Sequence, residues 1–172
     1  IVWKAMTTDY CHSSPCIADD RVVVGSADGS VNAFSLKDGK PLWKHKTGGP
    51  VYAGAAYTRG LFGIASGDGK VYGIDAKSGL PKWIYTMAVS NTNFAQSAAA
   101  TDGDRFFVGA WDNQLYAVQA TTGELVWKQA CNPRTFAFSP AIGSPHAANG
   151  SVYVSANGNG LFRFDGATGE KV

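Results

Sequence analysis

Few side chains in this 172-residue chain have the types and the spacing that metal binding or catalysis requires. The segment Cys11-His12-x-x-x-Cys16 places two thiols and an imidazole close together, and these are donors that Zn²⁺ prefers. A zinc site needs four ligands in paired short spacings, and neither Cys131 nor the remaining histidines supply a second pair. The sequence therefore predicts no metal site. It leaves open whether Cys11 and Cys16 form a disulfide, which would indicate an oxidising compartment, or stay free thiols.

The residues that could bind a ligand gather in two long loops, at about 85–95 and 128–138. These loops combine amide, aromatic and guanidinium groups, which suits a carboxylate, a sugar or a peptide. The candidate ligand-facing residues are Asn91, Asn93, Gln96, Asn132, Arg134 and Phe136. No phosphate-binding glycine loop or nucleophile elbow accompanies them, so the sequence assigns no catalytic residue. Long surface loops are also often simply solvated and variable, and that interpretation stays open.

The composition narrows the class of protein. Only 16% of the residues are charged and the net charge is +2, so there is no excess of cations to neutralise a nucleic-acid backbone. The chain has 21 glycines and 12% aromatic residues, which indicates short strands joined by tight turns rather than disorder. No apolar run approaches the ~18 residues of a transmembrane helix.

Tryptophan recurs at a regular spacing and marks an internal repeat. The repeat predicts the secondary-structure elements that must position the candidate ligand-facing residues. Four tryptophans lie 40, 40 and 44 residues apart, at Trp3, Trp43, Trp83 and Trp127. Each of the last three follows a glycine by four residues, as in Thr122-Gly123-Glu124-Leu125-Val126-Trp127, and another such phrase begins at Thr168-Gly169. Because an indole can reach a neighbouring repeat, we expect each Trp to stack on that repeat's glycine turn. The predicted docking residues are Trp3, Trp43, Trp83, Trp127, Gly39, Gly79, Gly123 and Gly169.

Each repeat also carries the pattern of four short strands. Alternating segments such as Val71–Ala76 follow pairs such as Asp68-Gly69, which tolerate the positive φ of a two-residue hairpin turn. The first strand of each repeat is rich in small residues and is expected at Ser14–Ala18, Tyr52–Tyr57, Gln96–Ala100 and Ser139–Gly143. Four strands in about 43 residues are typical of a β-propeller blade. We therefore expect an all-β propeller fold with about four antiparallel, four-stranded blades.

The repeated phrase resembles the tryptophan-docking motif Ala-x-Asp-x-x-Thr-Gly-x-x-x-Trp of pyrroloquinoline quinone (PQQ)-like repeats. The resemblance covers essentially the whole chain, with departures at Ser35 and Gln119 in place of the motif Asp and at Gly73 and Arg163 in place of the motif Ala. A WD-repeat propeller has a similar period, but the only Trp-Asp pair, Trp111-Asp112, lies at a hairpin turn.

The resemblance implies a ring of seven or eight blades, of which this chain would supply about half. We expect residues 1–4 to be the outer strand of a preceding blade and the blades to span approximately 14–46, 51–86, 95–130 and 138–172. The terminal blades would then expose apolar faces and a sheet edge. The expected partners are the remaining blades or a second copy of the chain, and Ile1–Lys4 could complete the fourth blade by strand exchange.

The resemblance also implies what a quinone site would need, because the dehydrogenases of this family share two further features. Adjacent cysteines form a disulfide over the quinone in those enzymes, and Glu, Asn and Asp side chains hold a Ca²⁺ ion. This chain has no adjacent cysteines, and its only glutamates, Glu124 and Glu170, stand in docking phrases. We therefore expect no cofactor in this segment, with PQQ and Ca²⁺ only under the alternative that it is a piece of such an enzyme.

Taken with these residues, the resemblance favours a non-catalytic scaffold or binding module of a larger secreted or periplasmic bacterial protein. The alternative is a fragment of a PQQ-dependent alcohol or sugar dehydrogenase. A propeller that binds a carbohydrate or a peptide through its long loops is a third possibility. The expected partners include a protein, peptide or carbohydrate ligand but no nucleic acid. We also expect no membrane-spanning segment in this chain.

Overall fold

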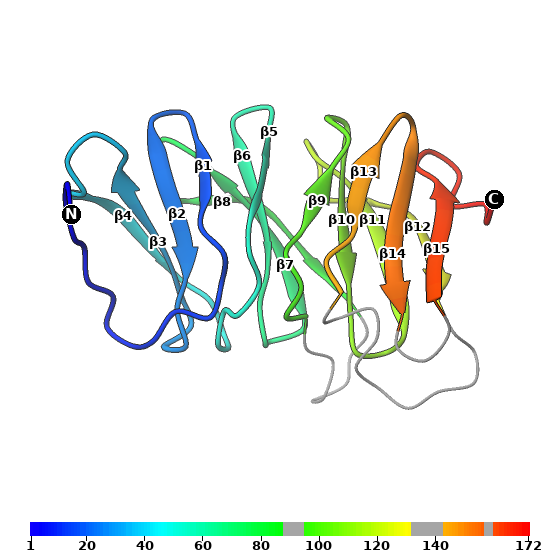
Figure 1. The fold of residues 1–172 in the computed structure, drawn as a ribbon, viewed down its shortest axis with the longest axis horizontal. Coiled ribbons are helices and arrows are strands. Elements are labelled where there is room, and N and C mark those ends of the chain that lie inside the picture. The colour runs from blue at the N-terminus through cyan, green and yellow to red at the C-terminus, as the bar shows by residue number, and fades with distance from the viewer. Residues whose placement is uncertain (88–94, 132–142, 157–159) are drawn as a thin grey trace.

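The computed structural model describes residues 1–87, 95–131, 143–156 and 160–172, and these form four antiparallel sheets side by side (Figure 1). We call the sheets blades 1 to 4 in chain order. The chain ends lie at opposite ends of this row (Figure 1). In the described residues no helix is long and apolar enough to cross a membrane. The prediction of an all-β, partial propeller is therefore confirmed.

Within each blade the strands follow the chain from an inner to an outer position. Blade 1 contains β1 (Cys16–Ala18), β2 (Arg21–Gly25), β3 (Ser30–Ser35) and β4 (Pro41–Lys46). Blade 2 contains β5 (Ala56–Thr58), β6 (Leu61–Ala65), β7 (Lys70–Asp75) and β8 (Pro81–Thr86). Blade 3 contains β9 (Ala100–Thr101), β10 (Arg105–Gly109), β11 (Gln114–Gln119) and β12 (Leu125–Ala130). Blade 4 contains β13 (His146–Ala148), β14 (Ser151–Ala156) and β15 (Gly160–Asp165).

The core lies between successive blades, where the two faces of neighbouring sheets meet. Phe62 and Phe106 stand on the faces that blades 2 and 3 turn toward the preceding blade, and both are fully buried. Phe106 lies so close to Gly63 of blade 2 that a Cβ there would be 2.5 Å from its ring. Because blades 2 and 3 have a neighbouring blade on both faces, their second strands β6 and β10 are almost entirely buried, which fits the low charge of the chain.

Small residues line the inner strands, where the blades converge. The residues two positions before each inner strand are Ser14, Gly54, Ala98 and Ser144. A Cβ on Gly54 would lie 2.9 Å from the Ala98 Cβ and 3.3 Å from the Ser14 carbonyl oxygen. The Ala98 N–H donates to the Ser144 hydroxyl at 3.1 Å. Larger side chains would therefore push the blades apart at this point.

The structure corrects the expected inner strands. The strand predicted at Gln96–Ala100 lies at Ala100–Thr101. The segment Ser139–Gly143, where another inner strand was predicted, lies almost wholly outside the described residues, and blade 4 has an inner strand at His146–Ala148. The reason is the tight turn that follows, since each inner strand ends immediately before it. Asn149 and Gly150 take positive φ values of 50° and 73°, and this turn fixes the register of β13 on β14.

Residues 1–4 were also expected to form a strand, and the structure assigns none there. A strand needs a partner edge, and within the described residues no strand pairs with this segment. The segment nevertheless keeps its place on blade 1 through Trp3, as described below.

Candidate functional site

Each tryptophan of the repeat lies against the glycine turn of the following blade. A Cβ on Gly79 would approach the Trp43 Cδ2 atom to 2.6 Å, and one on Gly123 would approach the Trp83 Cδ2 atom to 2.5 Å. These glycines have φ values of +71° and +74°, so both the backbone conformation and the contact with the indole require glycine. Gly39 receives Trp3 and Gly169 receives Trp127 in the same way.

The indole N–H groups make the same hydrogen bond in all four cases. Trp43 donates to the carbonyl of Ala76 and Trp83 donates to that of Ala120, both at 2.8 Å. Trp3 and Trp127 donate to the carbonyls of Leu36 and Gly166 at 3.0 and 2.9 Å. Trp43, Trp83 and Trp127 therefore each join two blades by stacking and by one hydrogen bond, and Trp3 holds the N-terminal segment on blade 1 in the same way. This role is structural rather than chemical.

Asp side chains shape the turns that receive the indoles. One Asp75 carboxylate oxygen accepts hydrogen bonds from the backbone N–H and the hydroxyl of Ser78, both at 2.8 Å. These bonds favour the charged form and hold the pKa of Asp75 below its usual value. Asp165 makes the equivalent bonds to Thr168, with the same effect on its pKa.

A hollow of about 360 Å³ lies where the connections between blades converge, and His12, Tyr52 and Gln96 line it. Each of these residues stands four positions before the inner strand of its blade, β1, β5 or β9. They therefore occupy equivalent places in three successive repeats. Because the inner strands surround the propeller axis, this hollow lies at one mouth of the central channel.

Aromatic rings and an amide give the hollow its chemical character. The His12 ring packs edge-on against Tyr10 and Tyr52, with ring centroids 5.2 and 5.5 Å apart. Tyr10 and His12 are exposed, and the side chains of Tyr52 and Gln96 are partly so. Exposed rings beside amide groups offer stacking surface and hydrogen bonds to an uncharged ligand such as a polypeptide. Among these described residues, no nucleophile is paired with a base.

Gln96 is the one predicted ligand-facing residue that the structure describes, and it lines the hollow. The other predicted residues lie outside the described part of the chain: Asn91, Asn93, Asn132, Arg134 and Phe136. His12 and Tyr52 were not predicted from the sequence to line a binding site. Their common distance from the inner strands was the signal that could have found them, but it required the correct strand boundaries.

The cysteines are free thiols in the structure, which decides between the two alternatives for Cys11 and Cys16. Cys11 is exposed, and its sulfur lies 3.3 Å from the Thr7 hydroxyl. Cys131 is buried among apolar residues, and burial raises the pKa of its thiol to about 12. Burial also raises the pKa of the Cys16 thiol, so neither Cys16 nor Cys131 has the lowered pKa of a reactive cysteine.

The described residues do not offer the donors of a calcium-held quinone. Across residues 1–87, 95–131, 143–156 and 160–172, no three His, Cys, Asp or Glu side chains form a group that could hold a metal ion. The described residues that line the hollow supply an imidazole, a phenol and an amide and no carboxylate. No step of a quinone reaction can be derived from these side chains.

Comparison with known proteins shows which proteins share this repeat. A family described as outer membrane protein assembly factor BamB matches residues 1–97 and 67–172. The outer membrane protein assembly factor BamB of Shewanella oneidensis is 28% identical over 140 residues, which cover 74% of this chain and 35% of that protein. Quinohemoprotein alcohol dehydrogenase of Comamonas testosteroni is 26% identical over 185 residues, covering 98% of this chain and 25% of that protein.

Among solved structures, BamB from Moraxella catarrhalis superposes with a TM-score of 0.79 at 21% sequence identity. The match covers 95% of this chain and 52% of that one, and it shows the fold alone. The chain therefore spans about a third of its curated assembly-factor relative and about half of this solved propeller.

Proposed function

The chain belongs to the PQQ-like repeat family described as outer membrane protein assembly factor BamB, and from this premise we propose that it is a non-catalytic binding module of a larger protein of the bacterial cell envelope. Its blades serve as a scaffold, and its channel mouth binds extended polypeptide partners. Such a module acts through the surface that it presents and not through a reaction.

The channel mouth carries the proposal. His12, Tyr52 and Gln96 come from three successive blades and meet in one hollow, so a ligand there touches several repeats at once. Rings with an exposed face and amide hydrogen-bonding groups suit a polypeptide, whose backbone supplies donors and acceptors and whose side chains supply apolar area. The relatives named as assembly factors support a polypeptide ligand and an envelope, periplasmic location for this chain.

A second candidate function is a piece of a quinone-dependent dehydrogenase, which the similarity to quinohemoprotein alcohol dehydrogenase supports. The chain lacks adjacent cysteines, and the described residues lack the carboxylate group that would hold calcium. The two candidates differ in one test, because adding PQQ and Ca²⁺ with an alcohol should give dye reduction only in a dehydrogenase. Turnover by this chain would refute the non-catalytic proposal.

A binding titration tests the proposed function directly. The probe is a fluorescently labelled outer-membrane β-barrel polypeptide, unfolded in urea and diluted into buffer, and fluorescence anisotropy reports its binding. We expect saturable binding that Tyr52→Ala weakens about tenfold, as the loss of a central aromatic contact does. Tyr57→Ala is the matched control, since Tyr57 lies on the inner strand β5 of the same blade and packs on Phe62 away from the hollow.

The control separates loss of binding from loss of folding. If the two variants weaken binding equally while both keep the circular dichroism spectrum of the wild type, the hollow is not the site. If the wild type shows no saturable binding, the polypeptide proposal itself fails.

A further inference from the structure

A second hollow lies at the end of the blades opposite to the channel mouth. The inner strands run from the mouth to the turns that connect β1 to β2 and β5 to β6, and these turns lie along one edge of the row of blades (Figure 1). The hollow has a volume of about 430 Å³ and extends from Asp19 of blade 1, past Arg59 and Lys77 of blade 2, to Thr121 of blade 3. We call it the turn hollow. Its volume is in the range of small-molecule sites, about 300–1,000 Å³.

Blade 2 differs from the other blades in the charges that it places at the turn hollow. Arg59 begins the turn between β5 and β6, whereas the corresponding turns begin with an acidic or amide residue: Asp19, Asp102 and Asn149. Lys82 precedes the docked Trp83, and at that position the outer strands of blades 1 and 3 carry an aliphatic residue: Leu42 and Val126. Because the other blades form the same sheets without these cations, the fold does not require them, and their convergence indicates a binding role.

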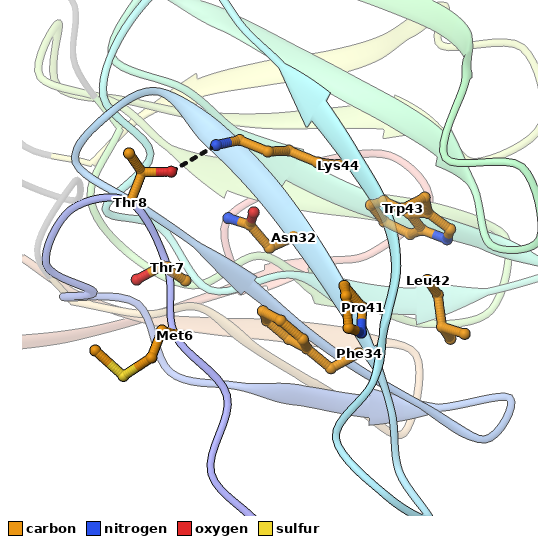
Figure 2. A pocket seen from close by; sticks show the side chains of 9 residues that line it. All are labelled: Met6, Thr7, Thr8, Asn32, Phe34, Pro41, Leu42, Trp43 and Lys44. Carbon is orange, nitrogen blue, oxygen red and sulfur yellow. Dashed lines mark hydrogen bonds between the residues drawn. The ribbon is translucent and has the colours of Figure 1, made fainter.

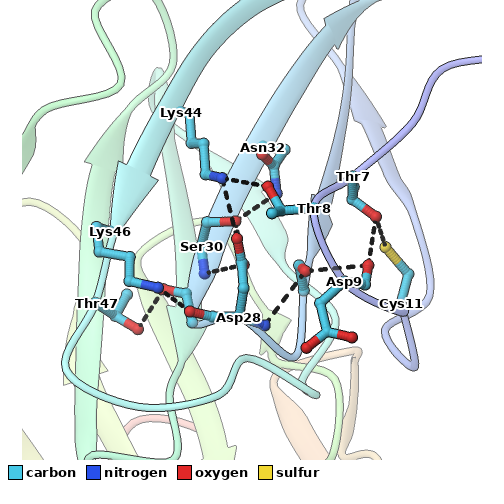
Figure 3. Close-up of polar contacts among 12 residues, drawn as sticks. Thr7, Thr8, Asp9, Cys11, Asp28, Ser30, Asn32, Lys44, Lys46 and Thr47 are labelled. Atoms are coloured by element: carbon cyan, nitrogen blue, oxygen red, sulfur yellow. Dashed lines mark hydrogen bonds and ion pairs between the residues drawn. The ribbon is translucent and has the colours of Figure 1, made fainter.

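A hollow of about 290 Å³ on blade 1 gives a contrast. Leu42 lies there in the position that Lys82 takes in blade 2 (Figure 2). The cation of that hollow, Lys44, already has partners within the chain. Its ammonium group donates to the Thr8 hydroxyl at 2.8 Å and to the Asp28 carboxylate at 3.0 Å (Figure 3). The hollow on blade 1 therefore offers no unpaired charge to a ligand.

Two carboxylates line the turn hollow, and both are engaged by neighbouring residues. The Asp19 carboxylate lies 3.0 Å from the Arg21 guanidinium group. One oxygen of Asp75 accepts hydrogen bonds from the Ser78 N–H and hydroxyl, both at 2.8 Å, and the other oxygen lies 3.8 Å from the Lys82 ammonium group. The negative charges in the lining are thus compensated from within the chain.

The groups of the turn hollow that have no partner can all donate hydrogen bonds. Among the described residues, the Lys77 ammonium group and the hydroxyls of Tyr57 and Thr121 make no hydrogen bond or ion pair. Arg59 is held beside them, because its Nε–H donates to the Gly103 carbonyl of blade 3 at 2.8 Å. A free ammonium group with free hydroxyls suits a ligand that is negatively charged and rich in acceptors.

We propose that the turn hollow binds the phosphate group of a small ligand. A phosphate carries about two negative charges and three acceptor oxygens at neutral pH, and lysine binds it as a point charge. In this site Lys77 pairs with the phosphate, and the hydroxyls of Tyr57 and Thr121 donate to its oxygens. A carboxylate fits less well, because it favours the planar fork of an arginine, and the Arg59 fork is already bound to blade 3. The site lies apart from the channel mouth and does not depend on the function proposed there.

Two sources of phosphate share this chemistry, a soluble phosphomonoester and the headgroup of a phospholipid, and the test has one arm for each. Isothermal titration calorimetry of the whole chain with glycerol 3-phosphate is the first arm, with glycerol as the uncharged control ligand. Co-sedimentation with phosphatidylglycerol vesicles is the second arm. We expect saturable binding in at least one arm, and added salt should weaken it because the attraction is electrostatic.

A matched pair of lysine variants locates the binding site. Lys77→Ala removes the free ammonium group and should raise the dissociation constant about tenfold. Lys37→Ala is the control, since Lys37 holds the same place in the docking turn of blade 1 and its loss changes the net charge equally. Both lysines are exposed, so both variants should keep the circular dichroism spectrum of the wild type. Tyr57→Phe, which removes only the hydroxyl, should also weaken binding.

The outcomes separate a specific site from general attraction to a basic surface. Binding that depends on Lys77 and not on Lys37 supports the proposal, and the arm in which it occurs identifies the source of the phosphate. Three results would overturn the proposal: no saturable binding in either arm, equal weakening by the two lysine variants, or binding that Lys77→Ala leaves unchanged.

Discussion

Replacing Gly79 by alanine should destabilise the protein more than replacing Gly60, although both glycines have nearly the same backbone conformation. Their φ values are +71° and +77°, so each substitution incurs the cost of a left-handed L-residue, about 1–2 kcal/mol. The surroundings differ. A Cβ on Gly60 meets nothing within 4 Å, whereas a Cβ on Gly79 would lie 2.6 Å from the Trp43 Cδ2 atom.

The added methyl group at Gly79 must therefore displace the indole. Overpacking of this kind costs about 1–3 kcal/mol, and it also disturbs the hydrogen bond from the Trp43 N–H to the Ala76 carbonyl. We expect a loss of about 2–5 kcal/mol for Gly79→Ala against about 1–2 kcal/mol for Gly60→Ala. Equilibrium urea unfolding, followed by circular dichroism and by tryptophan fluorescence, measures both values.

A double-mutant cycle assigns the difference to the docking contact. In a Trp43→Gly background, which also removes the Trp43 Cβ that would lie 2.9 Å from the added methyl group, the clash is absent, and Gly79→Ala should cost no more than Gly60→Ala does. Equal losses for the two glycine variants in the wild-type background would refute the account of tryptophan docking. An excess for Gly79→Ala that persists without Trp43 would refute it as well.

Three further predictions follow from other contacts. Trp83→Phe keeps an aromatic ring but leaves the buried Ala120 carbonyl without its hydrogen-bond donor, so urea unfolding should show a free energy of unfolding that is lower by about 1–3 kcal/mol. A variant that is as stable as the wild type would contradict the role of this hydrogen bond. Hydrogen bonds from Ser30 and Lys44 hold the pKa of Asp28 in the folded protein well below its usual value. The stability that this carboxylate provides is therefore present above its unfolded pKa and is lost as the pH falls through the lower folded pKa. The melting temperature of Asp28→Asn should accordingly fall less than that of the wild type from about pH 5 to about pH 2. A thiol reagent at about pH 8 should label exposed Cys11 in the native protein and leave buried Cys131 unlabelled until urea is added, and labelling of Cys131 at the same rate as Cys11 would show that the core is open.

The repeat made most of the fold predictable from the sequence. The recurrence of Trp43, Trp83 and Trp127 after glycines fixes the period, and pairs such as Asp68-Gly69 mark the hairpins, because few residues tolerate positive φ. The inner strands were less predictable. They are only two or three residues long, and the register of the following turn decides their limits, so the run of small residues at Gln96–Ala100 gave the wrong boundary.

The channel mouth was only partly predictable for the same reason. Gln96 stood out because its loop is long, whereas His12 was considered only as a zinc ligand and Tyr52 belongs to a shorter connection. Their convergence depends on blade packing, which brings equivalent positions of distant repeats together at the axis. The outer-strand character of Ile1–Lys4 was visible in the sequence, but among the described residues no strand pairs with this segment.

Site-directed photo-cross-linking tests the central claim, that the channel mouth is a polypeptide-binding site, most directly. A benzophenone amino acid replaces Tyr52 in one sample and Lys77, in a turn at the opposite end of blade 2, in another. Each is irradiated with the labelled outer-membrane β-barrel polypeptide diluted from urea, and the adducts are identified by mass spectrometry. The account predicts adducts from position 52 and none above background from position 77. Equal adducts from both positions, or adducts from position 77 alone, would contradict it.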